Sequence, residues 1–337
     1  MTGTRQYIYE FEKGDGKNKM LLGGKGANLC EMTQIGLNVP PGFTITTDAC
    51  TAYLEKNKLP QGLMDSVKSH MQALEKKTKK GFGSGDNPLL VSVRSGSSMS
   101  MPGMMDTVLN VGLTTKTVHG LALKTKNERF AQDSYRRFIG MFGSIVMGVN
   151  REHFEDILKH KKRDLGVTQD THLDAKALKE LVVSFKELVK EETKRDFPDD
   201  PLEQLRMAIN AVFSSWYGAR AVTYRRLYNI PETWGTAVNV VAMVFGNMGD
   251  TSGTGVAFTR DPATGQRQFF GECLTNAQGE DVVAGIRTPL PVKELEKFMP
   301  EAYKDLEATY KKLERHYRDM LDLEFTIQEG KLYMLQT

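Results

Sequence analysis

Residues 91–110, VSVRSGSSMSMPGMMDTVLN, constrain the fold of this chain most, because a strand pattern runs directly into a loop of serine, glycine and methionine. Residues 89–93 form a short apolar and β-branched run without a helix-length continuation, which predicts a buried strand. Arg94 therefore stands at the end of a strand. Its guanidinium offers a fixed fork of charged donors, and the small residues after it let the backbone approach an anion closely.

The loop after Arg94 supports two interpretations. It is a flexible lid over a polyphosphate, or it is a surface loop whose methionines enter a core. Glycine and methionine in a loop do not decide between the two. The methionines concerned are Met99, Met101, Met104 and Met105.

A second feature is the glycine-rich segment LLGGKGANLCE, in which Gly23, Gly24 and Gly26 surround Lys25. A helical pattern follows at residues 27–35, so the lysine is expected beside a helix N-terminus, where free N–H groups favour phosphate oxygens. The spacing matches neither a Walker A motif nor a Rossmann fingerprint. On these residues alone the segment is a tight turn or a phosphate site.

The third feature is a strictly alternating run, DLEFTIQ at residues 322–328, which predicts a half-buried strand. Residues two apart on a strand point to the same side at roughly 6.5 to 7 Å spacing, so Asp322 and Glu324 are neighbours. Two carboxylates beside phosphates suit Mg²⁺, although a solvated strand face explains them as well. A turn at Glu329 and Gly330 then predicts a hairpin that returns Gln336 toward the acidic face.

Seven segments together resemble the nucleotide-binding domain of the pyruvate phosphate dikinase family, and the matches run from residue 21 to residue 336. The segments are LLGGKGANL, LLVSVRSG with SMPGMMDT, SYRRF, GTAVNVVAMVFGN, SGTGVAFTRDPATG, NAQGEDVVAGIRTP and MLDLEFTIQEGKLYMLQ. The resemblance implies an α+β fold of ATP-grasp type, with two lobes and a helical insert subdomain. The expected domains are residues 1–112 with 200–242 as the first ATP-binding lobe, 113–199 as the helical subdomain, and 243–337 as the second lobe carrying the metal-binding hairpin.

The resemblance also implies roles for individual residues. Lys25 and Arg94 match the catalytic, phosphate-binding cations, and residues 100–107 match the lid loop. Asp322 and Glu324 match the Mg²⁺ ligands. The residues that match nucleotide-binding positions are Lys25, Arg94, Gly103, Met104, Val241, Met243, Glu280 and Gln336. Many relatives carry glutamine where Val241 stands, which leaves adenine recognition to other groups.

The family transfers the β-phosphoryl group of ATP to a histidine, with inorganic phosphate as co-substrate, toward phosphoenolpyruvate, AMP and pyrophosphate. The resemblance therefore implies ATP and phosphate as ligands, a separate phosphohistidine domain as partner, and a homodimeric full-length enzyme. The histidine motif of that domain does not occur here, so this chain is expected to bind Mg²⁺·ATP without making phosphoenolpyruvate alone. Alternatives are the nucleotide domain of a phosphoenolpyruvate synthase or a glucan dikinase, or a non-catalytic ATP sensor.

Composition excludes several other classes of protein. The formal net charge is +3 with both signs interspersed, so nucleic acid is not an expected partner. Cys30, Cys50 and Cys273 are widely spaced, which predicts buried thiols rather than a disulfide framework or zinc site. Neither a secretory leader nor an apolar run of roughly 18 residues occurs, so no membrane is expected and the cytoplasm is the default compartment.

Periodicity predicts helices at residues 127–147, 173–193 and 201–228, and one long helix at 291–319. The segment DPATG at residues 261–265 predicts a hairpin turn. Arg136 and Arg137 lie together on the first of these helices. For such a pair, a structural salt bridge or a solvated face is the expected role.

Overall fold

The computed structural model describes residues 6–283 and 287–337, and of Glu280 and Val283 only the backbone. Its contacts divide the chain into two compact units. The first unit is Met1–Ala27 with Pro41–Met243, and the second is Asn28–Pro40 with Val244–Thr337. Residues 113–199 belong to the first unit, and residues 28–40, which the sequence assigned to the first lobe, pack with the second. A separate helical subdomain stays a prediction.

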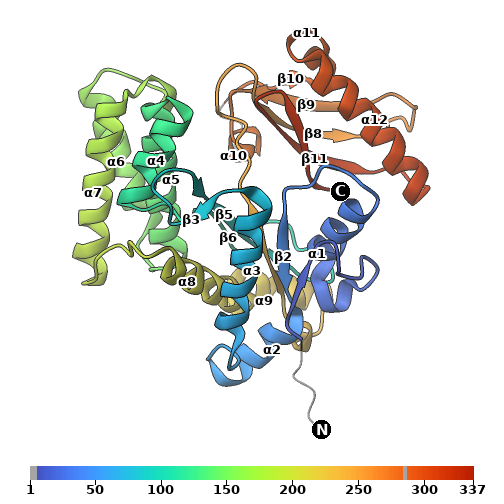
Figure 1. The fold of residues 1–337 in the computed structure, drawn as a ribbon, viewed down its shortest axis with the longest axis horizontal. Helices are drawn as coiled ribbons and strands as arrows, with labels where there is room; N and C mark the ends of the chain where they lie inside the picture. Colours follow the sequence, from blue (N-terminus) through green and yellow to red (C-terminus); the bar gives the residue numbers. More distant parts are fainter. Residues whose placement is uncertain (1–5, 284–286) are drawn as a thin grey trace. The chain divides into compact units, whose positions relative to one another are not determined.

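The main sheet of the first unit has the strand order β1-β2-β7-β5-β6, and neighbouring strands run antiparallel (Figure 1). Its strands are β1 (Ile8–Glu10), β2 (Gly42–Ile45), β5 (Val91–Gly96), β6 (Thr107–Val111) and β7 (Ala237–Ala242). The short strands β3 (Gly81–Phe82) and β4 (Pro88–Leu89) form a parallel pair. The strand predicted at residues 89–93 is confirmed only in part, because residue 89 belongs to β4 and β5 begins at Val91. β5 also continues past Arg94 to Gly96, because it keeps pairing with β7 as far as Ala237.

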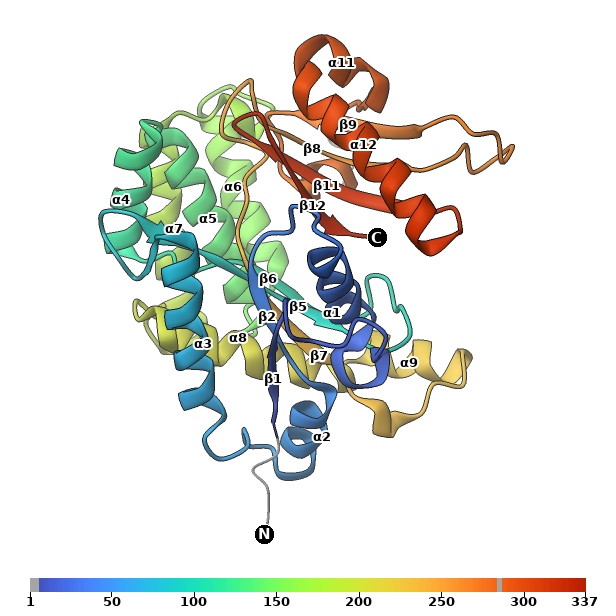
Figure 2. The same cartoon turned by 45° about the vertical axis from the view of Figure 1, so that its right-hand side comes forward.

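Helix α1 (Lys19–Gln34) begins in the first unit, and its second half lies in the second unit. The other helices of the first unit are α2 (Thr47–Lys56), α3 (Leu63–Thr78), α4 (Thr115–Thr125), α5 (Glu128–Ile145), α6 (Arg151–Asp164), α7 (Ala175–Thr193), α8 (Pro201–Ser214) and α9 (Ala219–Leu227). Its 3₁₀ turns are η1 (Asp170–His172), η2 (Ser215–Tyr217) and η3 (Glu232–Trp234). Figures 1 and 2 show α4 to α7 side by side, and α8 contacts β5, β6 and β7.

The helix predicted at residues 127–147 is confirmed, and the Asn127 side chain caps α5 by accepting from the Phe130 N–H at 2.9 Å. The helix predicted at 201–228 is wrong as a single element. It divides into α8, η2 and α9 because Gly218 has extended backbone (φ −60, ψ 145).

Arg136 and Arg137 form structural ion pairs, as expected. The side chains of Arg136 and Asp133 are each only 7% exposed and pair across one turn of α5. Arg136 also contacts Asp170 at 3.2 Å, and Arg137 contacts Asp133 at 3.1 Å. The contact of Arg136 with Asp170 therefore links α5 to η1.

The sheet of the second unit has the order β10-β9-β8-β11-β12, again with antiparallel neighbours. Its strands are β8 (Gly253–Phe258), β9 (Phe270–Thr275), β10 (Leu290–Pro291), β11 (Asp322–Gln328) and β12 (Lys331–Gln336). The helical elements are α10 (Gly279–Val283), η4 (Val292–Glu294), α11 (Leu295–Phe298) and α12 (Pro300–Tyr317). Figure 2 shows α12 beside this sheet. Helices and antiparallel sheets make the chain an α+β protein.

Two hairpins of the second unit agree with the sequence patterns. β8 and β9 pair across the predicted DPATG turn, in which the Asp261 carboxylate accepts from the Ala263 N–H at 2.8 Å. β11 and β12 are joined by Glu329 (φ 49) and Gly330 (φ 78), the positive φ values of a type I′ turn. The predicted long helix at 291–319 is wrong, because Pro300 starts α12 and Met299 before it is not helical (φ −142, ψ 65).

Cys30, Cys50 and Cys273 are buried free thiols, which confirms their predicted character. Burial raises the pKa of Cys50 to about 12 and the pKa of Cys273 to about 11. Within residues 6–283 and 287–337, no helix combines the length and the apolar character needed to cross a membrane.

Candidate functional site

The glycine turn of α1 packs directly against the end of β5. Gly23 breaks the helix with φ 68 and ψ 163, a conformation essentially restricted to glycine. A Cβ on Gly23 would lie 1.8 Å from the Gly96 carbonyl oxygen, and the Gly24 N–H donates to the Ser97 carbonyl at 2.8 Å. Gly23 therefore allows a backbone approach that a side chain would prevent.

This packing positions Lys25 on the face of the sheet that carries Arg94. A Cβ built on Gly96 would lie 3.2 Å from the Lys25 Cβ. Arg94 is two residues before Gly96 on β5, so both positions are on the same side of the strand. The structure thus puts the two predicted cations on one face of the sheet, with Lys25 just after the break from which α1 continues to Gln34.

Asn239 is a part of this arrangement that the sequence analysis missed. It is fully buried on β7, pairs in register with Arg94 and Thr44, and accepts from the Thr44 hydroxyl at 2.8 Å. Its amide atoms would lie 2.8 and 2.9 Å from a Cβ on Gly26 and on Gly96, respectively. The available signal was one polar residue inside the apolar strand AVNVVA.

The loop after β5 packs three of its four methionines, Met101, Met104 and Met105, as the second interpretation expected. Met101 is buried against Trp216, Ala221 and Ile230, and Met104 and Met105 pack against this cluster. Met99 is 45% exposed. Gly103 has φ 71, with nothing within 4 Å of the position a Cβ would occupy, so its surroundings on this side are open. The packing is compatible with a lid that is seated on a core.

Val241 and Met243, two of the residues predicted to bind the nucleotide, lie at the end of β7, which stops at Ala242. Val241 is buried and pairs with Gly42 and Ser92. The half-buried Met243 follows the strand and donates its N–H to the Leu90 carbonyl at 2.9 Å. The side chain of Glu280, the further predicted nucleotide contact, lies outside the described residues.

The acidic hairpin belongs to the second unit. On β11, Asp322 is exposed and Glu324 half-buried, while Leu323 and Phe325 between and after them are buried, as the alternation predicted. Glu324 is in register with Gln336 of β12, with a bulge after Glu324. The hairpin therefore brings Gln336 beside the acidic face. Its Oε1 is buried without a hydrogen-bond partner among the described residues.

The side chains of Asp322, Glu324 and Gln336 offer carboxylate and amide oxygens, the type of ligand that Mg²⁺ prefers. Within the part of the chain that the structure describes, no group of three or more His, Cys, Asp or Glu side chains is arranged to hold a metal ion. A magnesium ion held here would thus depend on a carboxylate pair and on oxygens of a ligand. The unpartnered Gln336 oxygen beside Glu324 fits such a ligand-completed site.

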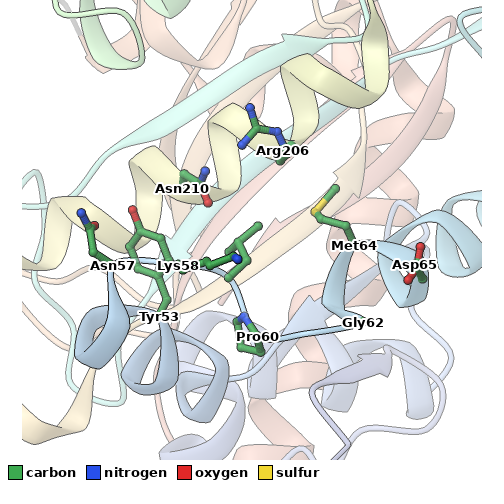
Figure 3. A pocket seen from close by; sticks show the side chains of 10 residues that line it. Tyr53, Asn57, Lys58, Pro60, Gly62, Met64, Asp65, Arg206 and Asn210 are labelled. Atoms are coloured by element: carbon green, nitrogen blue, oxygen red, sulfur yellow. The ribbon is translucent and has the colours of Figure 1, made fainter.

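A cavity of about 350 Å³ lies elsewhere in the first unit, between α2, the α2–α3 connection and α8 (Figure 3). Tyr53, Lys58 and Asn210 are among its lining residues, and none of the predicted site residues is. Arg206, which also lines it, is engaged with Glu203 at 2.8 Å. The lining of the cavity therefore includes neither the glycine turn nor the acidic hairpin.

Comparison with known proteins agrees with the resemblance seen in the sequence. The family model described as "Pyruvate phosphate dikinase, AMP/ATP-binding domain" matches residues 19–81 and 58–293. Proteins named pyruvate, phosphate dikinase are 57% identical over 337 residues in Entamoeba histolytica and 54% identical over 334 residues in Clostridium symbiosum, in each case covering 98% of this chain. A chloroplastic one from Flaveria pringlei is 52% identical over 341 residues and covers 100%.

The chain spans between a third and two fifths of the length of these relatives, namely 38%, 38% and 36%. The family match and the identities cover the glycine turn, the loop after β5 and β7, and the identities extend through the acidic hairpin. On these grounds the chain belongs to the family of pyruvate phosphate dikinase AMP/ATP-binding domains.

Proposed function

We propose that this chain is the nucleotide-binding domain of a pyruvate, phosphate dikinase, and that it binds Mg²⁺·ATP and initiates phosphoryl transfer. The observation that carries the proposal is the packing of Gly23 and Gly24 on the end of β5, which puts Lys25 on the face that carries Arg94. Two cations fixed by backbone contacts suit a polyphosphate. The family match supports the choice of ATP.

In the proposed reaction, an enzyme histidine on a separate domain attacks the β-phosphorus of ATP. The bond between the α,β-bridging oxygen and the β-phosphorus breaks, and AMP leaves. Inorganic phosphate then attacks the γ-phosphorus, the bond between the β,γ-bridging oxygen and the γ-phosphorus breaks, and pyrophosphate leaves while the β-phosphoryl group stays on the histidine. The phosphohistidine later transfers this group to pyruvate, which gives phosphoenolpyruvate. Lys25, Arg94 and the lid N–H groups neutralise charge that develops on the phosphate oxygens.

The carboxylate hairpin would hold Mg²⁺ in this proposal. Asp322 and Glu324 would ligate the ion, and Gln336 would bind beside the phosphates. When bound, the ion would neutralise part of the phosphate charge and so lower the repulsion toward an attacking group. The oxygen donors of the hairpin and the unpartnered Gln336 Oε1 support this assignment.

Four further parts of the proposal rest on the resemblance. The fold is of ATP-grasp type, the chain around Val241 and Met243 flanks the adenine, Glu280 contacts the nucleotide, and the full-length enzyme is a homodimer. A cytoplasmic location stays a prediction, and several plant relatives are named chloroplastic.

Titration of ATP into the chain tests the assigned cations. Lys25→Ala and Arg94→Ala should each weaken ATP binding about 10-fold or more, because each removes a charged hydrogen-bond donor from phosphate. Arg163→Ala, a loss of the same charge at an exposed position on α6, should leave the affinity unchanged. Unchanged affinity in both site variants would refute the assignment.

Isotope transfer tests the reaction. The chain is mixed with a separate phosphohistidine domain and with ATP labelled at either the β- or the γ-phosphate. The β-label should reach the histidine domain, and the γ-label should appear in pyrophosphate only when inorganic phosphate is added. Release of the γ-label as free phosphate would instead indicate a phosphoenolpyruvate synthase. ATP binding without any transfer would favour the non-catalytic sensor.

A further inference from the structure

The loop between β5 and β6 is held by a set of contacts that the reaction chemistry does not require. We call the residues beneath it, Ser215, Trp216, Arg220 and Ala221, the lid seat. At the base of the loop, the Asp106 N–H donates to the Ser215 hydroxyl at 3.3 Å, and this hydroxyl donates to the Val212 carbonyl at 2.7 Å. The lid seat thus anchors the loop to η2 and α9.

The tip of the loop is a tight turn at residues 101–104. The Met104 N–H donates to the Met101 carbonyl at 3.2 Å, and Gly103 has φ 71. Proline at the second position and glycine with positive φ at the third are the features of a type II turn. The Gly103 N–H takes no part in the turn's hydrogen bond, and no acceptor is placed against it among the described residues.

Arg220 reaches this turn from the first turn of α9. One terminal nitrogen donates to the Gly103 carbonyl at 3.1 Å, and the other contacts the Asp106 carboxylate at 3.4 Å. The peptide between Gly103 and Met104 is therefore fixed at both ends, through its carbonyl by Arg220 and through its N–H by Met101. The neighbouring peptide, which carries the Gly103 N–H, gains a defined orientation from this.

We propose that Arg220 is a positioning residue, which clamps the lid turn so that the Gly103 N–H is presented to a phosphate oxygen of ATP. The inference rests on the proposed function and adds to it a residue outside the phosphate-binding set. The Met101 contact with Trp216 supports the base of the turn, and Arg220 sets its tip. A planar fork fits the two acceptors, which a lysine ammonium would meet one at a time.

Asp106 completes the clamp by orienting the guanidinium. Burial raises the pKa of Asp106 and the Arg220 charge lowers it, with burial the larger effect. The Arg220 side chain is 67% exposed, so its removal is not expected to disturb the core beneath the loop. The variant should fold, and its effect should be confined to the lid.

The test compares Arg220→Ala with Arg226→Ala, an equal loss of charge at an exposed position on the same helix. Calorimetry measures the affinity for ATP and for AMP, which lacks the β- and γ-phosphates. Arg220→Ala should weaken ATP binding about 3- to 10-fold and leave AMP binding unchanged. Arg226→Ala should change neither. Arg220→Lys should restore only part of the ATP affinity.

A second measurement reports on the lid itself. The chain has two tryptophans. Trp216 lies in one buried cluster with Met101, and Trp234 packs against this cluster. Arg220→Ala should therefore make tryptophan fluorescence more accessible to acrylamide, and ATP should reverse this less completely than in the wild type. Asp106→Asn, which leaves α9 intact, should give a smaller change of the same sign.

The outcomes separate the two proposals. A wild-type chain that binds no ATP would overturn the proposed function and this inference with it. ATP binding that Arg220→Ala leaves unchanged would overturn only the positioning role. An equal loss of ATP and AMP affinity, or an equal effect of Arg226→Ala, would show a general charge effect and would overturn it as well.

Discussion

Gly23 of α1 and Gly96 of β5 meet backbone to backbone, so closely that a Cβ on Gly23 would lie 1.8 Å from the Gly96 carbonyl oxygen. The contact joins the turn before Lys25 to the strand that carries Arg94. The turn of α1 can therefore approach the end of β5 this closely because neither Gly23 nor Gly96 carries a side chain.

Gly23→Ala should destabilise the chain by about 3 kcal/mol and abolish high-affinity ATP binding, because alanine tolerates neither the contact nor φ 68 with ψ 163. Gly24→Ala is the control, since its Cβ would be 3.4 Å from the Ser97 carbonyl, an ordinary contact. It should change the free energy of unfolding by less than about 1 kcal/mol. Urea unfolding and ATP titration measure both effects, and similar behaviour of the two variants would contradict the packing argument.

The sequence indicated this turn, but not what it packs against. Three glycines around Lys25 predict a tight turn because glycine permits positive φ, which is a local property. Contact with Gly96 depends on the pairing of β5 with β7, which joins segments more than a hundred residues apart. Asn239 was missed for the same reason. Its amide lies next to Gly26, Gly96 and Thr44, which are all far from it in the sequence.

The buried pair of Asp133 and Arg136 should dominate the acid sensitivity of the helical part of the first unit. Burial raises the pKa of Asp133, but the charges of Arg136 and Arg137 and a hydrogen bond from Arg136 outweigh this and lower it overall. Asp133→Asn should cost about 3 kcal/mol at pH 7, since it leaves a buried guanidinium without its counter-charge. Urea unfolding measures the difference.

The pH dependence of that difference follows from the sign of the shift. A carboxyl whose pKa is depressed on folding stabilises the native state above its unfolded pKa, here 3.8, and loses this contribution as the pH falls through the folded value. The cost of Asp133→Asn should thus be constant from pH 7 to 5 and shrink below about pH 4. Asp164→Asn, at an exposed position on α6, should show neither effect. A cost that is still undiminished at pH 2 would argue against the ion pair.

Asp322→Asn and Glu324→Gln should remove the Mg²⁺-dependent part of ATP binding. Affinity is measured with excess Mg²⁺ and with a chelator. The wild type should bind ATP more tightly with Mg²⁺, and each variant should lose about 10-fold of this gain because a carboxylate ligand is lost. Binding in the chelator should be unchanged. Glu329→Gln, at the exposed turn of the same hairpin, is the control, and a Mg²⁺ effect that survives both site substitutions would place the metal elsewhere.

The local sequence patterns predicted where helices and strands occur better than where they are broken. The acidic hairpin was predictable because strict alternation, a Glu-Gly turn and a second apolar run all describe one structure. The breaks at Gly218 and Met299 were not expected, since the apolar period continues across both. The contact of Arg220 with Gly103 joins residues 117 positions apart, so no local pattern contains it.

Replacement of Gln336 should have opposite effects on the free energy of unfolding and on the affinity for ATP. Its Oε1 is buried without a hydrogen-bond partner among the described residues, which costs the folded chain free energy. Gln336→Leu should therefore raise the free energy of unfolding by about 1 kcal/mol. It should also weaken ATP binding, because it removes the polar group that the proposed function assigns to the phosphates.

Gln328→Leu on the same hairpin is the matched control for Gln336→Leu. The Gln328 Oε1 accepts from the Phe245 N–H at 2.9 Å, so its loss should lower the free energy of unfolding by about 1 kcal/mol. Urea unfolding without ligand and calorimetry with Mg²⁺·ATP measure the two quantities. If Gln336→Leu lowered stability as Gln328→Leu does, the oxygen would have a structural role. A residue that lowers the stability of the ligand-free chain but raises its affinity for a ligand is instead expected in a binding site.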